Sequence, residues 1–263
     1  IIKKYESHGV RPHEHDITSD GRLLYMPFMG DGVYKVFDTE KGEVIAEIPT
    51  DGFPHNAIIS PDDRFAYLSP MDLEDRPVEP IKAAGYPTSE NRYVHVVDLA
   101  THKTVSKIDM GDAPRPIAIS PDGKYLYVNR DGFQGILVVD TKKRKIVAKV
   151  PYTLTEREAA KPSRTHGLWP TPDGKELWTC DVNHGVIYGF DVTKMPPVQI
   201  ARVETNTPAY WLTGSPDSQF LYVASPPNNV VSVIDIGIRK VVEVIRRPKG
   251  NEPKRMLVVD VPK

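Results

Sequence analysis

The 263-residue chain contains one cysteine, Cys180, so it cannot form an internal disulfide. It also lacks a Cys-x-x-Cys-His motif, which excludes a covalently attached c-type haem. No apolar run approaches the roughly 18 residues that a membrane-spanning helix needs, so we expect no transmembrane segment. Positive and negative charges nearly cancel, with 34 Lys and Arg against 35 Asp and Glu. This balance lacks the basic surface on which nucleic-acid-binding proteins depend, and it argues against that class of partner.

What the chain does contain is a repeated unit, and residues 113–150 hold its clearest copy. The unit begins with an apolar run, Ile117–Ile119, and continues into the turn Ser120–Gly123, whose Pro and Gly suit a tight turn. A Tyr-rich run, Tyr125–Val128, and two further apolar runs follow, separated by polar turns. The pattern predicts four short antiparallel strands in each unit. Related turns recur at residues 19–21, 61–63, 172–174 and 216–218.

The spacing of these turns indicates a repeat of roughly 40 to 45 residues with loop insertions, which is the period of a β-propeller blade. Two blocks within the repeats, Leu126–Asn129 and Leu221–Ala224, have the sequences LYVN and LYVA. They resemble the signature of the YVTN-type β-propeller repeat proteins. We therefore expect an all-β fold in which residues 1–263 form a single six-bladed propeller domain of four-stranded antiparallel blades.

The two ends of the chain hold only parts of a repeat. Residues 1–9 align with the fourth strand of a blade, and Met256–Val259 matches a first strand. We expect both termini to contribute to one closing blade, because closure removes exposed strand edges, but its second and third strands have no counterpart in the sequence. No signal peptide precedes Ile1, which indicates a cytosolic protein or a trimmed mature form. YVTN-type proteins are frequently exported, so the resemblance favours a periplasmic location.

Two connections are longer than the repeat requires. Residues 71–91 are predicted to form a loop with a short helix around Pro80–Ala84, and Leu154–Thr165 contains a predicted helical turn at Thr155–Ala160. In a meandering four-stranded blade, both kinds of connection emerge on the same face. Excess loop on one face of a repeat scaffold marks the expected binding side.

Potential site residues occupy one register of the repeats, close to the start of each innermost strand. Ring closure is expected to gather them around a central channel. The residues in this register are His13, His55, Arg115, His166, Tyr210 and Lys254.

The first hypothesis is a transition-metal site held by His13, His15, His55 and His166. His13 and His15 are two residues apart, so in an extended strand their side chains project to the same side. Imidazole suits copper or zinc, which are the cofactors we expect, with redox chemistry on a small substrate as one outcome. The placement resembles that in nitrous-oxide-reductase-type propellers, although this chain lacks a recognisable cupredoxin domain and has fewer channel histidines.

Other interpretations remain open. Arg115, Tyr210 and Lys254 suit an anionic small molecule, and His184 lies in a hairpin on the same face. The chain could equally be a non-catalytic module that binds a ligand or another protein, or its polar channel mouth could have no ligand. A lactonase-type hydrolase ranks last, because the inner register offers imidazoles instead of carboxylates. The sequence does not decide whether the chain is an enzyme.

Several residues are predicted to have structural roles only. His95 and His102 are expected on the solvated surface, and Cys180 is expected to be a small buried hydrophobe. Trp169, Trp178 and Trp211 are expected to fill gaps between blades. A recurrent aspartate is expected to form turns in every repeat, at Asp38, Asp98, Asp140, Asp191 and Asp235.

Overall fold

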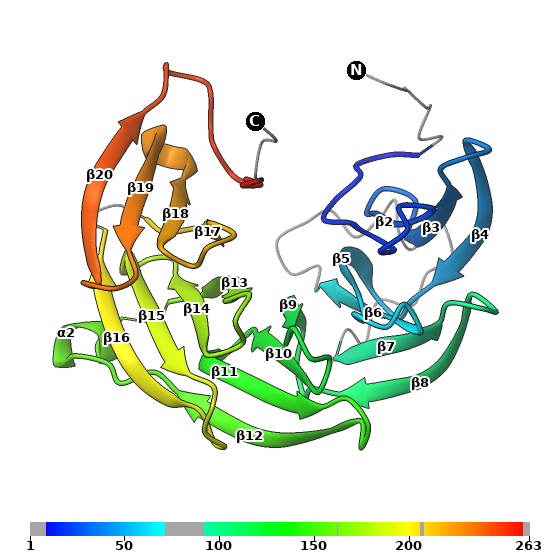
Figure 1. The fold of residues 1–263 in the computed structure, drawn as a ribbon, viewed down its shortest axis with the longest axis horizontal. Helices are drawn as coiled ribbons and strands as arrows, with labels where there is room; N and C mark the ends of the chain where they lie inside the picture. Colours follow the sequence, from blue (N-terminus) through cyan, green and yellow to red (C-terminus); the bar gives the residue numbers. More distant parts are fainter. Residues whose placement is uncertain (1–8, 72–91, 162, 206–207, 260–263) are drawn as a thin grey trace. The chain divides into compact units, whose positions relative to one another are not determined.

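The computed structural model describes residues 9–71, 92–161, 163–205 and 208–259. Within these residues it contains five four-stranded antiparallel sheets, numbered here one to five in chain order (Figure 1). Each sheet is made of four strands that are consecutive in the chain, and each strand pairs with the next. This is the meandering arrangement that the repeats predict.

The strands are short, and their bounds follow sheet by sheet. Sheet one contains β1 (Asp16–Ile17), β2 (Leu23–Phe28), β3 (Val33–Asp38) and β4 (Glu43–Pro49). Sheet two contains β5 (Phe53–Ile59), β6 (Phe65–Met71), β7 (Tyr93–Asp98) and β8 (Lys103–Asp109). Sheet three contains β9 (Pro114–Ile119), β10 (Tyr125–Arg130), β11 (Phe133–Asp140) and β12 (Lys145–Pro151). Sheet four contains β13 (Thr165–Pro170), β14 (Glu176–Asp181), β15 (Val186–Asp191) and β16 (Val198–Glu204). Sheet five contains β17 (Trp211–Gly214), β18 (Phe220–Ser225), β19 (Val230–Asp235) and β20 (Lys240–Arg246).

The chain forms two compact units, residues 1–117 and 118–263, and each is described by itself. Unit one contains sheets one and two. Unit two contains sheets four and five and nearly all of sheet three, whose first strand, β9, begins in unit one.

The turn between the first and second strands of each sheet is held by a short hydrogen-bonded motif. In sheet three, Ser120 Oγ donates to Asp122 Oδ1 over 2.7 Å, and the Lys124 N–H donates to the same oxygen over 3.0 Å. The Tyr125 N–H donates back to Ser120 Oγ over 2.9 Å. Equivalent hydroxyl–carboxylate bonds occur at Thr18–Asp20, Ser60–Asp62, Thr171–Asp173 and Ser215–Asp217. These contacts confirm the predicted turns.

The recurrent aspartate between the third and fourth strands is also a turn former, as predicted. Asp140 Oδ1 accepts from the Lys143 N–H over 2.7 Å. Backbone N–H groups that follow the other four aspartates donate to them in the same way.

Apolar side chains of neighbouring sheets pack into shared clusters. In unit one, one cluster joins Tyr34 and Ile48 of sheet one to Leu68 of sheet two. In unit two, one cluster joins sheets three and four and another joins sheets four and five. Trp178 and Cys180 are fully buried in the second of these, which confirms their predicted structural roles.

The helical turn predicted at Thr155–Ala160 is present as α2 (Glu156–Ala159). Thr155 caps it in a capping box with Glu158, which satisfies two N–H groups at the start of the helix. A 3-10 helix, η1 (Pro226–Asn228), follows β18. None of the helices in the described residues is long and apolar enough to cross a membrane.

The predicted count of six blades is not confirmed. Five sheets are present in the described ranges, and residues 248–259 contain no strand, so the first strand predicted at Met256–Val259 is absent. Residues 1–8, which were predicted to supply the fourth strand, lie outside the described residues, as does the helix predicted around residues 80–84.

Candidate functional site

In unit one, two of the predicted metal ligands lie side by side. The ring centroids of His13 and His55 are 4.3 Å apart, and His55 is only 3% exposed. The backbone explains the contact, because a parallel bridge joins Glu14 to Asn56 and brings the innermost strands of sheets one and two together. A register shift between Pro54 and Asn56 marks a bulge at His55.

The hydrogen bond between the two residues fixes the state of one ring. His13 Nδ1–H donates to the carbonyl oxygen of His55 over 2.7 Å. This bond places a proton on His13 Nδ1 and orients the ring, as a backbone carbonyl does for many metal-binding histidines.

The two other predicted residues in unit one have different surroundings. His15 is exposed, and its Nδ1 lies 3.3 Å from the carbonyl oxygen of His13. Arg115 is half-buried, and its guanidinium lies 3.6 Å from the Met71 sulfur.

In unit two, three predicted residues come together with two others in a group that we call the cation–aromatic cluster (His166, Tyr210, Trp211, Lys254 and Arg255). The His166 ring is 4.4 Å from the Tyr210 ring and 5.4 Å from the Trp211 ring. Lys254 Nζ lies 5.0 Å from the centre of the Tyr210 ring, and the Arg255 guanidinium carbon lies 4.7 Å from the centre of the Trp211 ring.

A glycine makes the position of His166 possible. Gly167 adopts a left-handed conformation with φ of 55°, at a bulge where the register shifts between His166 and Leu168. A Cβ at this position would lie 3.1 Å from the Cys180 sulfur and 3.1 Å from the Leu212 nitrogen. The Gly167 N–H donates to His166 Nδ1 over 3.1 Å, so the neutral ring carries its proton on Nε2.

Sequence reasoning found part of this cluster and missed the rest. The repeat register identifies His166, Tyr210 and Lys254. Trp211 was read only as a gap filler, and Arg255 was not considered. The adjacent pairs Tyr210–Trp211 and Lys254–Arg255 were the signal that would have found them.

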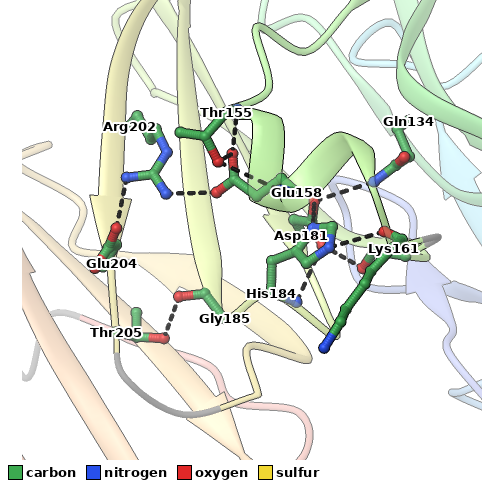
Figure 2. Close-up of polar contacts among 11 residues, drawn as sticks. Gln134, Thr155, Glu158, Lys161, Asp181, His184, Gly185, Arg202, Glu204 and Thr205 are labelled. Carbon is green, nitrogen blue, oxygen red and sulfur yellow. Dashed lines mark hydrogen bonds and ion pairs between the residues drawn. The ribbon is translucent and has the colours of Figure 1, made fainter.

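His184, which was predicted to contact a ligand, is engaged within the protein at both ring nitrogens. Figure 2 shows it between Asp181 and Lys161: Nδ1 is 2.9 Å from Asp181 Oδ2, and Nε2 is 2.9 Å from the carbonyl oxygen of Lys161. Asp181 is fully buried and also accepts from the Ser163 hydroxyl. These contacts give His184 a structural role, tying the connection after α2 to the β14–β15 hairpin.

The same connection is held at its other end by an ion pair between the partly exposed Arg202 and the buried Glu158, also drawn in Figure 2. Arg202 donates to Glu158, and Glu158 Oε2 accepts from the Thr155 N–H over 2.7 Å. Burial raises the pKa of the Glu158 carboxyl, but the hydrogen bonds from Arg202 and Thr155 outweigh it and lower this pKa to about 2. Glu158 is therefore a charged anchor of the elaborated connection at neutral pH.

The prediction that His95 is a solvated surface residue is wrong, whereas His102 is partly exposed. His95 is 2% exposed, and His102 is half-buried with its Nδ1 2.8 Å from the Tyr25 hydroxyl. The repeat position of His95 is buried in every sheet, whatever the residue type. The equivalent residues are Lys35, Leu137, Tyr188 and Ser232.

Within the described ranges, no three His, Cys, Asp or Glu side chains gather in a group that could hold a metal ion. The predicted metal set takes His13, His15 and His55 from unit one and His166 from unit two. The described residues therefore show no metal centre, and metal binding stays a prediction.

Comparison with known proteins identifies the fold. No family profile matches the chain. It is 26% identical over 242 residues to protein NirF of Pseudomonas aeruginosa, covering 89% of this chain and 58% of that protein. It is 26% identical over 192 residues to antigen Lp49 of Leptospira interrogans, covering 68% of this chain and 38% of the antigen. The chain thus spans well under two thirds of the length of these curated relatives.

Two solved structures align over most of the chain. Hydrazine synthase of Kuenenia stuttgartiensis aligns with a TM-score of 0.67 and 21% identity, over 88% of this chain and 67% of that one. The β-propeller domain of Cps50 (Swd1) from Myceliophteria thermophila aligns with a TM-score of 0.73 and 14% identity, over 95% of this chain and 76% of that one. Membership of the YVTN type and export both stay predictions. The five meandering sheets and these neighbours show that the chain has a β-propeller fold.

Proposed function

We propose that this chain is a ligand-binding propeller that holds a small anionic molecule, carrying carboxylate or phosphate groups, at the cation–aromatic cluster of unit two. The observation behind the proposal is the stacking of two permanent cations on two adjacent aromatic rings, with a buried imidazole beside them. The five residues of the cluster include two positive charges and no carboxylate.

The donors of the cluster suit an anion. The Arg255 guanidinium offers a planar fork that matches a carboxylate or phosphate, and Lys254, which is exposed, offers an ammonium. Tyr210 adds a hydroxyl. His166 Nδ1 accepts from the Gly167 N–H, which places the ring proton on Nε2. A cation–π contact at an exposed site contributes only about 0.5 to 1 kcal/mol, so these contacts orient the cations without neutralising their charge.

The test is calorimetric titration with citrate and with inorganic pyrophosphate as probes. Lys254→Ala and Arg255→Ala are each expected to weaken binding about tenfold, because each removes one charge-assisted hydrogen bond. Lys142→Ala, which removes an exposed lysine from a turn of the same unit, is the matched control and should leave the affinity unchanged. Equal affinities in all three variants, or no binding of either probe, would refute the proposal.

As a second candidate we propose the copper or zinc site predicted from the sequence, centred on His13 and His55 in unit one. The proposal rests on the 4.3 Å approach of the two rings and on the Nδ1–H bond that orients the His13 ring. Elemental analysis after reconstitution of untagged protein tests it, together with the melting temperature, which a metal bound only by the folded state must raise. His55→Ala should abolish both effects and His102→Gln should preserve them. A metal-free protein with an unchanged melting temperature would refute this candidate.

A further inference from the structure

Unit one contains a groove, independent of the proposed anion site, between β4 of sheet one and β7 and β8 of sheet two. Its volume is about 680 Å³, which falls within the range of roughly 300 to 1,000 Å³ typical of small-molecule sites. Glu47, Pro49 and Asp51 line the side formed by sheet one. His95, Lys103 and Lys107 line the side formed by sheet two. We refer to it as the β4–β8 groove.

The unusual element of the groove is a buried imidazole whose ring nitrogens make no hydrogen bond to the described residues. The His95 side chain is 2% exposed, and its Nε2 lies 3.0 Å from Asp51 Oδ2. Neither Nδ1 nor Nε2 has a hydrogen-bond partner in the part of the chain that the structure describes, and the approach of Nε2 to Asp51 is an ion-pair contact. Buried polar atoms of native proteins are nearly always hydrogen-bonded, so this imidazole indicates a group that the protein itself does not supply.

The protonation state of His95 determines which kind of group fits. Burial lowers the pKa of His95 to about 4, and it outweighs the opposing effect of Asp51. The ring is therefore neutral at physiological pH. Nε2 is the ring nitrogen nearest the Asp51 carboxylate, so the favoured tautomer carries its proton there. In that tautomer Nδ1 is a lone-pair acceptor, and its ligand must donate a hydrogen bond.

Two other uses of such an imidazole fit less well. A general base works best with a pKa near the operating pH, and a value of about 4 makes His95 a poor proton acceptor. A metal ion would need further ligands, but Lys107 Nζ lies 2.6 Å from Asp51 Oδ2 and places a positive charge beside the nearest carboxylate.

The charges along the groove cancel. Glu47 and Asp51 oppose Lys103 and Lys107. Lys107 lies opposite His95 in the β7–β8 register, and Lys103 is four residues away, so the two Cα atoms are about 13 Å apart along the strand. The lining therefore combines donors and acceptors with no net charge among these four side chains, and Pro49 adds an apolar wall.

We infer that the β4–β8 groove binds a neutral polyhydroxylated molecule of the size of a mono- or disaccharide, one hydroxyl of which donates a hydrogen bond to His95 Nδ1. Every sugar hydroxyl both donates and accepts, so one ligand satisfies the imidazole, the carboxylates and the ammonium groups together. Its C–H faces suit the apolar wall.

The experiment uses the full chain labelled with ¹⁵N in histidine, and it follows the two His95 nitrogens by NMR during titration with trehalose and with maltose. At least one sugar is expected to shift the Nδ1 resonance saturably. His95→Leu, which removes the acceptor, should weaken sugar binding about tenfold in calorimetry, and His95→Gln, which retains an acceptor, should weaken it less. The exposed His15→Gln is the control and should bind as the parent does. If His95→Leu does not fold, Lys103→Ala on the rim replaces it, with the same weakening expected.

Three other results of the titration would refute sugar binding in the groove. If the His95 resonance responds to Zn²⁺ and to neither sugar, the groove is a metal site and the sugar inference is wrong. If the resonance responds to an uncharged model peptide and to neither sugar, the groove is a peptide site and the sugar inference is wrong. A resonance that moves with none of these probes would mean that water alone satisfies Nδ1. Lys254→Ala should leave the sugar titration unchanged, which separates this site from the proposed anion site.

Discussion

Val203 and Ile245 occupy the same position in the outermost strands of two neighbouring sheets, but Val203 is 5% exposed whereas Ile245 is 37% exposed. Val203 lies opposite Ile187 in the β15–β16 register, and Ile245 lies opposite Val231 in the β19–β20 register. The side chain of Val203 packs in the cluster shared with sheet five. The described residues provide no such cover for Ile245.

This difference predicts unequal costs for two truncations. Val203→Ala should lower the free energy of unfolding by about 2 kcal/mol, since it removes buried methyl groups and leaves a cavity. Ile245→Ala should cost about 1 kcal/mol or less, although it removes more atoms, because the position is already in contact with water. Urea unfolding followed by circular dichroism measures both. A larger loss for Ile245→Ala would show that a further element covers sheet five.

Two glycines with similar backbone conformations should respond differently to alanine. Gly21 has φ of 72° with open space around its Cβ position, so Gly21→Ala should cost only the conformational strain, about 1 kcal/mol. Gly167→Ala adds crowding against Cys180 and Leu212, and it should cost about 2 to 3 kcal/mol in total.

The same variant should also disturb the cluster. Because Gly167 positions His166, citrate binding should weaken in Gly167→Ala and remain normal in Gly21→Ala. Thermal melts and calorimetry provide the two readouts, and equal effects of both substitutions on stability would contradict the packing argument.

Acid should lower the free energy of unfolding by protonating Glu158, which holds the connection that contains α2. The pKa of Glu158 is lowered to about 2 from an ordinary 4.5, so the folded state binds fewer protons than the unfolded state between these values. The resulting stabilisation is fully present above pH 4.5 and is lost as the pH falls towards 2.

Glu158→Gln removes this dependence. Its unfolding free energy should be lower than that of the parent at neutral pH, and the difference should shrink as the pH falls from 4.5 to 2. Glu156→Gln, an exposed change in the same helix, should leave the pH profile of the parent intact. Urea unfolding at several pH values checks both. A constant difference across this range would rule out the linkage.

Cys180 should be unreactive in the folded protein. It is fully buried, and burial raises the pKa of its thiol well above the ordinary value, so little thiolate is present and reagents cannot reach it. A thiol-specific chromogenic reagent should label less than one group per chain until urea unfolds the protein. Rapid labelling under native conditions would show that the core around Trp178 opens readily.

The repeats made the strands and turns predictable. Each Ser-Asp or Thr-Asp turn forms its bonds within six residues, so its identity depends on local sequence alone. The pairing of His166 with Tyr210 was also within reach, because counting from the repeated turn places residues of different repeats in equivalent positions. The register also identified His13 and His55, and their innermost strands are adjacent in unit one.

The rest depended on contacts that no repeat encodes. His184 resembles a free ligand in sequence, but the Lys161 carbonyl that engages it belongs to a connection found in one repeat only. His95 resembles a surface residue because its neighbours in the alignment include Lys35 and Ser232. Burial at that position comes from the packing of two sheets, and the identity of the side chain does not reveal it.

The lone, shielded thiol in the core shared by sheets four and five has a practical consequence. A cysteine introduced on an exposed turn would be the only group on the folded chain that a maleimide dye modifies rapidly, so Cys180 need not be replaced first. One such cysteine in each unit would accept a donor–acceptor pair. Energy transfer between the dyes would then report the spacing of the two units in solution, with and without citrate or trehalose.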